Sequence, residues 1–262
     1  MVTKTTSVRA VSKAIKRPSK SSRKLTSASF EKIKTEKKGR DWQNIWVARE
    51  ENYARIFGPS LPKDKVLSRE GAWTTQQEGA REEFCILQYA PKPDRMGWVY
   101  VTHGLSQLSQ KTGKGDRIEL VLHWKVKDNK APAQILSKVS NYILERGQAL
   151  VRGDLISVNK LDAGVAGLPH WLICAPDRCM PAQIAAPCHF KFMLILGITD
   201  AEMQCAQRVK PELADGSQVL LEALRSSGIL PVTDSARNCL TRRGDYRRLW
   251  ENAYRAVREK ME

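Results

Sequence analysis

The stretch from Gly97 to Trp124 constrains the fold more than any other part of this 262-residue chain. Residues 98–102 (WVYVT) are β-branched and aromatic, which suits a strand, and Gly104 follows where a bend needs a residue without a Cβ. In a second strand, residues 117–124, every other side chain is a large apolar one. A polar, glycine-rich loop joins the two. The sequence therefore predicts a strand pair with one face on a hydrophobic core.

The positive charge of the chain is concentrated at its N-terminus. The whole chain has a net charge of +16, and residues 1–40 hold 13 Lys and Arg against 2 Asp and Glu. Residues 41–262 hold 31 basic and 26 acidic residues, a net charge of only +5. The apolar residues of the first 40 are too sparse to bury the surface that would offset chain entropy. We therefore expect residues 1–40 to form a disordered basic tail.

The basic tail also leaves a second kind of function open. Clustered basic residues bind nucleic acid or an anionic membrane without sequence specificity. A nucleic-acid-associated or regulatory role through the tail is therefore the alternative hypothesis, and the tail is the only segment for which the sequence suggests nucleic-acid binding. The Arg- and Ser-rich start also resembles an organelle transit peptide. No secretory signal follows it, and no run reaches the ~20 apolar residues of a membrane span. We expect a cytoplasmic protein without a membrane partner.

Helix and strand patterns interleave along the rest of the chain without strict alternation. The predicted helices span residues 41–57, 133–146, 218–226 and 245–260, and a further one begins at Thr199, where Glu202 completes a capping box. The predicted strands outside the first pair span residues 84–89, 155–158, 172–174, 190–198 and 229–233. Residues 190–198 are nearly all apolar, which predicts a central strand covered on both faces. The fold class is α+β, a mixed, mostly antiparallel sheet with helices packed on it, as a single globular domain behind the tail.

No recognised catalytic motif is present in the chain. The histidines are His103, His123, His170 and His189, and none of them sits in a nucleophile or metal motif. The glycine-rich segment 113–116 joins two strands, whereas a phosphate loop must open a helix. We therefore expect no enzyme activity and no catalytic residues. A hydrolase whose His, Asp and Cys residues meet only in the folded chain is a third hypothesis.

The six cysteines do not form a regular disulfide or metal framework. The densest group is Cys174, Cys179, Cys188 and His189, whose spacing is looser than the close Cys pairs of zinc sites. Without a secretory signal, reduced thiols are expected. We expect neither a metal nor a cofactor.

Several segments, taken in order, resemble the suppressor-of-fused domain family. Residues 100–106 (YVTHGLS), followed by 118–122 (IELVL), are similar to the family's strand pair. The later matching segments are Asn141–Leu144, Gly153-Asp154, Pro176-Asp177, Phe192–Glu202 and Pro231–Asp234, and Ile56–Pro59 matches upstream. The similarity runs from about Trp42 to Arg243. We therefore divide the chain into the tail, a suppressor-of-fused-like domain at residues 41–243, and a C-terminal amphipathic helix at residues 244–262.

The resemblance implies an α+β domain without catalytic activity that binds another protein. Animal members of the family have two lobes, sequester a transcription factor and hold an extended peptide between the lobes. The family's groove-lining Tyr and Asp correspond to Tyr142 and Asp154, which are the partner-binding candidates here. Each also has a structural alternative, Tyr142 as helix core and Asp154 as a turn former.

Only one helix is predicted beyond Arg243, so we expect no second lobe like that of the animal proteins. In this respect the chain resembles compact single-lobe bacterial relatives, which in turn resemble immunity proteins of polymorphic toxin systems. The leading hypothesis is a protein-binding module that binds and neutralises a cognate toxin.

Overall fold

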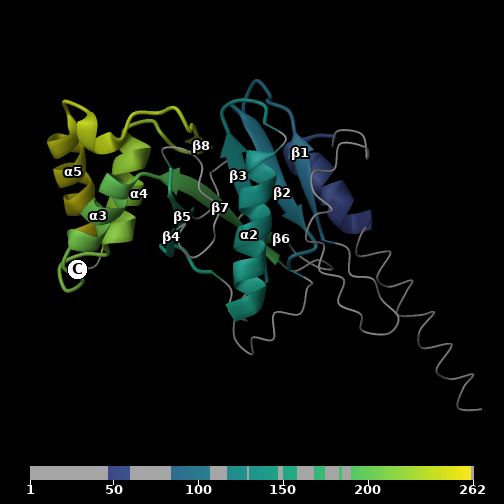
Figure 1. The fold of residues 1–262 in the computed structure, drawn as a ribbon, viewed down its shortest axis with the longest axis horizontal. Coiled ribbons are helices and arrows are strands. Elements are labelled where there is room, and N and C mark those ends of the chain that lie inside the picture. The colour runs from purple at the N-terminus through teal and green to yellow at the C-terminus, as the bar shows by residue number, and fades with distance from the viewer. Residues whose placement is uncertain are drawn as a thin grey trace, which may run out of the picture. The chain divides into compact units, whose positions relative to one another are not determined.

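The computed structural model of the chain describes residues 47–59, 84–106, 117–128, 130–146, 150–157, 168–174, 183–184 and 190–260. The predicted tail, the start of the first predicted helix, the loop at 113–116 and the candidate ligands Cys179, Cys188 and His189 lie outside these residues. The strands are β1 (Cys85–Tyr89), β2 (Trp98–His103), β3 (Ile118–Trp124), β4 (Leu155–Ser157), β5 (His170–Cys174), β6 (Gln183–Ile184), β7 (Phe190–Ile198) and β8 (Val232–Thr233) (Figure 1).

The strands form one mixed sheet in the order β1-β2-β3-β7-β5-β4, and β6 and β8 pair with β7 and β3. β3 runs parallel to β7 and to β8, and every other pair is antiparallel. In the predicted strand pair, Trp98 of β2 lies opposite Trp124 of β3. The mostly antiparallel α+β sheet that the sequence predicts is therefore confirmed.

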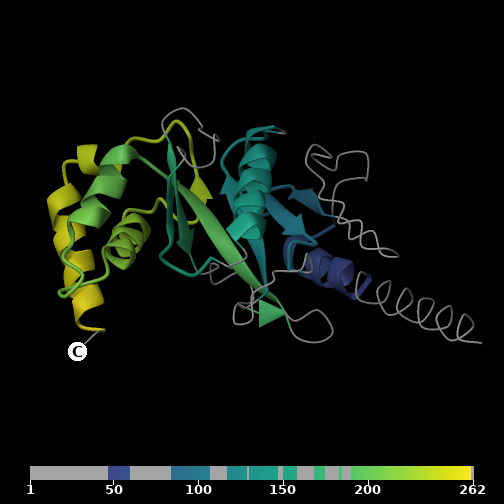
Figure 2. The same cartoon turned by 60° about the horizontal axis from the view of Figure 1, so that its bottom comes forward.

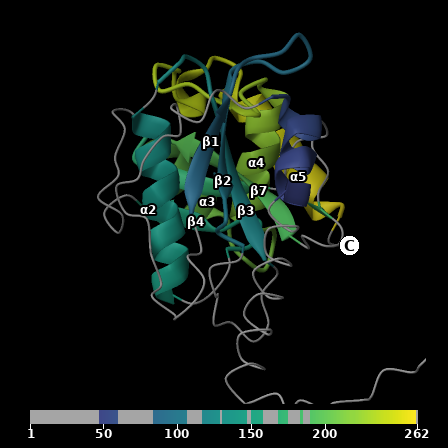
Figure 3. The same ribbon diagram turned by 90° about the vertical axis from the view of Figure 1, so that its right-hand side faces the viewer.

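Helices cover both faces of this sheet. They are residues 47–57, α2 (Ala131–Arg146), α3 (Asp200–Arg208), α4 (Gly216–Ser226) and α5 (Tyr246–Arg258). α2 lies on one side of the strands, and the 47–57 helix, α4 and α5 lie on the other (Figure 3). α4 packs against both α3 and α5 at the end of the sheet away from the 47–57 helix (Figure 2).

The sheet separates two clusters of buried apolar side chains. The α2-side cluster comprises Phe84, Ile86, Tyr100, Leu105, Ile118, Leu120, Leu122, Trp124, Ala133, Ile135, Leu136, Val139, Ile143, Leu150, Ile156, Trp171, Ile173, Met193 and Ile195. The α4-side cluster comprises Tyr53, Phe57, Tyr89, Val99, Val101, Val121, Leu172, Cys174, Ala214, Leu240, the even-numbered residues of β7 and the buried apolar residues of α3, α4 and α5.

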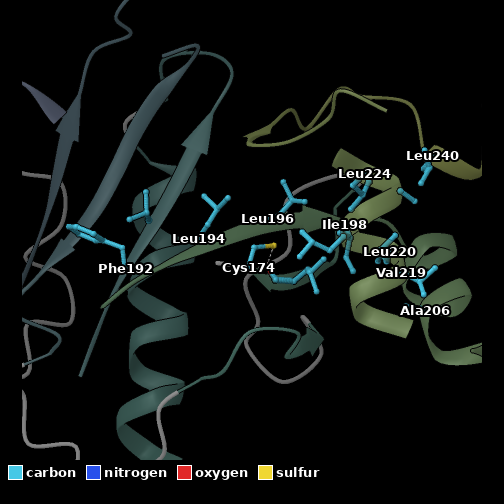
Figure 4. Close-up of a cluster of buried hydrophobic side chains, with 14 of the residues drawn as sticks. Cys174, Phe192, Leu194, Leu196, Ile198, Ala206, Val219, Leu220, Leu224 and Leu240 are labelled. Carbon is cyan, nitrogen blue, oxygen red and sulfur yellow. Dashed lines mark hydrogen bonds between the residues drawn. The ribbon is translucent and has the colours of Figure 1, made fainter. Parts of the chain in front are cut away.

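β7 contributes side chains to both clusters. Its even-numbered residues, Phe190 to Ile198, pack toward the α4 side, where Leu196 and Ile198 approach Leu220 and Leu224 (Figure 4). Met193 and Ile195 pack on the α2 side. The prediction of a central strand covered on both faces is confirmed, because apolar residues on alternate sides of a strand pack against opposite layers.

The burial of β3 differs from what the sequence predicts. Ile118, Leu120, Leu122 and Trp124 face α2 as the alternation predicts, but all seven residues of the strand are buried. The expectation that only one face of this strand lies on a core is wrong. The 47–57 helix covers the second face, where Glu119 and His123 are buried as well.

Most other predicted elements are confirmed with small shifts at their ends. Thr199 caps α3 and forms the predicted capping box with Glu202. The helix that ends at residue 57 is followed by Gly58, whose φ of 89° is favourable only for glycine. The last strand is shorter than predicted, because only Val232 and Thr233 pair with β3.

Candidate functional site

His103 and His123 lie inside the fold, on β2 and β3, and each is at most 2% exposed. Burial, and after it the charge of Arg49, lowers the pKa of His103 from its usual 6.5 to about 3. The ring of Tyr53 packs edge-on against the imidazole, with 5.2 Å between centroids. His103 is therefore neutral at pH 7 and shielded from solvent, which suits packing better than acid–base chemistry.

Of the three histidines that the structure describes, His170 comes nearest to a catalytic arrangement. Its Nε2 lies 2.8 Å from Oδ1 of Asp200, and Ser157 is its direct partner across β4 and β5. A Ser–His–Asp relay needs the serine hydroxyl on the other ring nitrogen. Nδ1 of His170 is buried and has no hydrogen-bond partner among the residues that the structure describes. Ser157, His170 and Asp200 therefore share a location without forming a relay.

The described residues contain no group of three or more His, Cys, Asp and Glu side chains that could hold a metal ion. Cys85, Cys174, Cys205 and Cys239 are free thiols. Burial raises the pKa of the Cys174 thiol to about 12. A thiol with so high a pKa is a poor metal ligand and nucleophile.

Asp154 forms the turn that precedes β4. Its Oδ2 accepts a hydrogen bond from the amide of Val151 at 2.8 Å, and its own amide donates to the Val151 carbonyl at 3.1 Å. Gly153 has a φ of 96°, and a Cβ there would lie 2.7 Å from Oγ of Ser217 in α4. The structural alternative for Asp154, a turn former, is therefore present in the fold. Its side chain is half-buried.

Tyr142 lies in the last two turns of α2. Its ring is half-buried and packs against the α2-side cluster, next to the fully buried Ile143. The structural alternative for Tyr142, packing against the core, is also present. Tyr142 packs on the α2 face of the sheet, whereas Gly153, the residue before Asp154, lies against the start of α4 on the other face. A ligand that contacts both faces has to span an edge of the sheet.

β4 is such an edge. It pairs with β5, and none of the strands in the described part of the chain pairs with its other side. The amide of Ile173 in β5 donates to the Asp154 carbonyl at 2.9 Å. Residues of an antiparallel strand alternate between pointing toward and away from the partner strand. The main-chain groups of Asp154 and Ile156 thus face β5, and those of Leu155 and Ser157 point away from it.

The sequence did not predict that the main-chain N–H and C=O groups of Leu155 and Ser157 point away from β5. The Gly153-Asp154 step marks the position of the turn, but the direction of the following amides depends on the register with β5. The sequence signal is weak because the strand has only three residues. β4 and the turn of Asp154 make up the candidate site, whereas α2, which carries Tyr142, packs mainly on β1, β2 and β3.

The helices of the described residues do not include one long and apolar enough to cross a membrane. No curated protein shows a significant match to the chain. Among solved structures, a chain of the Sufu–Fu complex is 18% identical, with a TM-score of 0.55 over 81% of this chain and 96% of that chain. A putative SUFU homologue from Neisseria gonorrhoeae FA 1090 is 16% identical, with a TM-score of 0.45 over 60% of this chain and 78% of that one. Drosophila Suppressor of Fused is 19% identical, with a TM-score of 0.47 over 68% of this chain and 46% of its own.

The sequence itself gives the strongest of these comparisons. The family model described as suppressor of fused protein (SUFU) matches residues 81–238, which is more than half of the chain. The matched residues run from the segment before β1 to the loop after β8 and so include the whole sheet. The chain belongs to the suppressor of fused family.

Proposed function

We propose that this protein is a non-catalytic binding module that takes an extended segment of a partner protein onto the β4 edge. The observation that carries the proposal is the outward main chain of Leu155 and Ser157. Membership of the suppressor of fused family supports it, since a family member has been solved in complex with Fu. Tyr142 and Asp154 are the candidate side-chain contacts.

An added strand would gain main-chain hydrogen bonds from β4. Leu155 and Ser157 each present one N–H and one C=O on the open side, and each bond contributes about 0.5–1.5 kcal/mol net. Successive side chains of the added strand point to opposite faces of the sheet. One set would therefore lie toward the α2 face, where Tyr142 packs, and the other toward the α4 face, where Gly153 meets the start of α4. Main-chain bonds give part of the affinity, and these side-chain contacts give the specificity.

We further propose that the partner is a toxin and that this chain is a cytoplasmic bacterial immunity protein. The support is the family membership together with the open edge of β4. In this role, tight binding of an extended toxin segment is itself the neutralising step. No reaction of His, Cys or Asp groups is required.

Co-expression tests the proposed role. The product of each gene adjacent to this one in the native host is expressed alone and with this protein, and cell survival is measured. The proposal expects one neighbour that kills cells alone and is neutralised by this chain in a stable complex. Buried Leu120→Asp gives the unfolded control. If no neighbour is toxic and none binds, the immunity role is wrong.

A further inference from the structure

The segment that contains α5 carries most of the net charge outside the tail. From Arg242 to Lys260 there are seven Lys and Arg residues and three Asp and Glu residues, a net charge of +4. Residues 41–262 together have a net charge of +5. The positive charge outside the tail is therefore gathered into one short segment at the end of the chain.

The packing of α5 fixes which way this charge points. Leu249, Ala253 and Val257 are spaced four residues apart and are buried in the α4-side cluster. Residues at this spacing share one face of a helix, so the other side faces solvent. All of the basic side chains are exposed: Arg242, Arg243, Arg247, Arg248, Arg255, Arg258 and Lys260. We call Arg247, Arg248, Arg255 and Arg258 the α5 basic face.

Part of this charge is neutralised by ion pairs within the protein. Asp245 pairs with Arg243, with 3.0 Å between Nε and Oδ1, and more loosely with Arg248, at 3.7 Å. Arg242, Arg247 and Arg255 form no ion pair with any residue that the structure describes. Their guanidinium groups are therefore available to a ligand.

We propose that the α5 basic face binds the phosphate backbone of double-stranded DNA. A guanidinium group donates two parallel hydrogen bonds to one phosphate, and all four members of the face are arginines. With a helix rise of 1.5 Å per residue, Arg247 and Arg258 lie about 17 Å apart along the axis. That length matches roughly five base-pair steps of 3.4 Å. The face can therefore contact several phosphates of one duplex.

The chemistry of the face favours a duplex over an acidic protein or a single strand. A specific protein interface has an apolar centre, but the apolar side of α5 is turned inward. Binding of a single strand relies on aromatic rings that stack on bases. Trp250 and Tyr254 are half-buried against the core and do not form such a platform. Backbone contacts alone would give binding without sequence preference.

The test measures the salt dependence of binding to a 20-base-pair DNA duplex by the full-length protein. Three variants are compared with the unaltered chain. The first combines Arg247→Gln, Arg255→Gln and Arg258→Gln, and the second has Lys at the same three positions. The third is a control that removes equal charge elsewhere through Arg55→Gln, Lys127→Gln and Lys130→Gln, all at exposed sites. Circular dichroism checks that each variant is folded.

The proposal expects the Gln variant on α5 to lower the slope of log K against log salt by about 2.7, because each lost phosphate contact removes about 0.9. The Lys variant should keep the slope and bind more weakly, and the control should match the unaltered chain. Equal slopes for the α5 and control variants would overturn the proposal, since the tail or net charge would then explain binding. It is also overturned if the α5 substitutions weaken binding to polyglutamate and leave DNA binding unchanged.

Discussion

Arg49 and Glu119 form an ion pair in which neither side chain is exposed, with 2.8 Å between Nη1 and Oε1. The same carboxylate accepts hydrogen bonds from Thr102 Oγ1, from the amide of Gly104 and from both the amide and the hydroxyl of Ser106. Through Glu119, the ion pair connects the 47–57 helix with Gly104 and Ser106 in the turn after β2. Residues 104–106 belong to a segment that resembles the family. Their role in this fold is structural, because they bind the buried carboxylate of Glu119.

Arg49→Met should lower the free energy of unfolding by roughly 3–5 kcal/mol, because it leaves the charge of Glu119 buried without its cation. Urea titration at pH 7 measures the change. Glu222→Ala is the matched control, since it breaks the exposed Arg225–Glu222 pair, and should cost at most about 1 kcal/mol. If both substitutions cost the same, the buried pair does not hold the helix.

The free energy of unfolding should decrease as the pH is lowered, and His103 should account for part of this decrease. The unfolded chain binds a proton on this histidine near its usual pKa of 6.5, whereas the folded chain does so only near pH 3. The neutral His103 therefore contributes stability above pH 6.5, and this contribution is lost as pH falls from 6.5 toward 3, by at most about 1.4 kcal/mol per pH unit. Urea titrations at pH 4 to 7 should give His103→Gln a flatter profile than the unaltered chain. If the free energy of unfolding depends on pH equally in both proteins, the lowered pKa of His103 is wrong.

The alternation in residues 118–124 predicted correctly which side chains face α2, because a period of two is a local property. It failed on the opposite face, where Glu119 and His123 were expected to face away from the core. Glu119 is buried because Arg49, 70 residues earlier, pairs with it. The open side of β4 was likewise beyond local patterns, since it follows from the register of two separate segments. The capping box of Thr199 and Glu202 was predictable because its parts are three residues apart.

Leu120→Asp should prevent stable folding, because the new carboxylate would replace a fully buried side chain in the α2-side cluster. The loss should be several kcal/mol, measured as the yield of soluble protein and by thermal unfolding. Val126→Asp is the control, because Val126 is 59% exposed just beyond the same strand, and should change stability by about 0.5 kcal/mol or less. Tolerance of Leu120→Asp would contradict the packing of β3 against α2.

Tyr142→Ala and Asp154→Ala should weaken partner binding more than they weaken the fold. Both side chains are half-buried, and the hydrogen bond that the Val151 amide donates to the Asp154 carboxylate contributes about 0.5–1.5 kcal/mol. A tenfold rise in the dissociation constant, about 1.4 kcal/mol, is expected for each variant with the purified partner. Equal losses of binding and unfolding free energy would show that these residues are only structural.

Proline at Ser157 tests the central claim, strand addition at β4, most directly. The amide of Ser157 points away from β5, so Ser157→Pro removes a hydrogen-bond donor from the open edge and leaves the β4–β5 bonds in place. Ser157→Ala keeps that amide and is the control. The measurement is the dissociation constant of the neighbouring gene's product for each variant, by titration calorimetry. We predict that Ser157→Pro weakens binding at least tenfold while Ser157→Ala binds like the unaltered chain. Unchanged binding by a folded Ser157→Pro variant would contradict strand addition at β4.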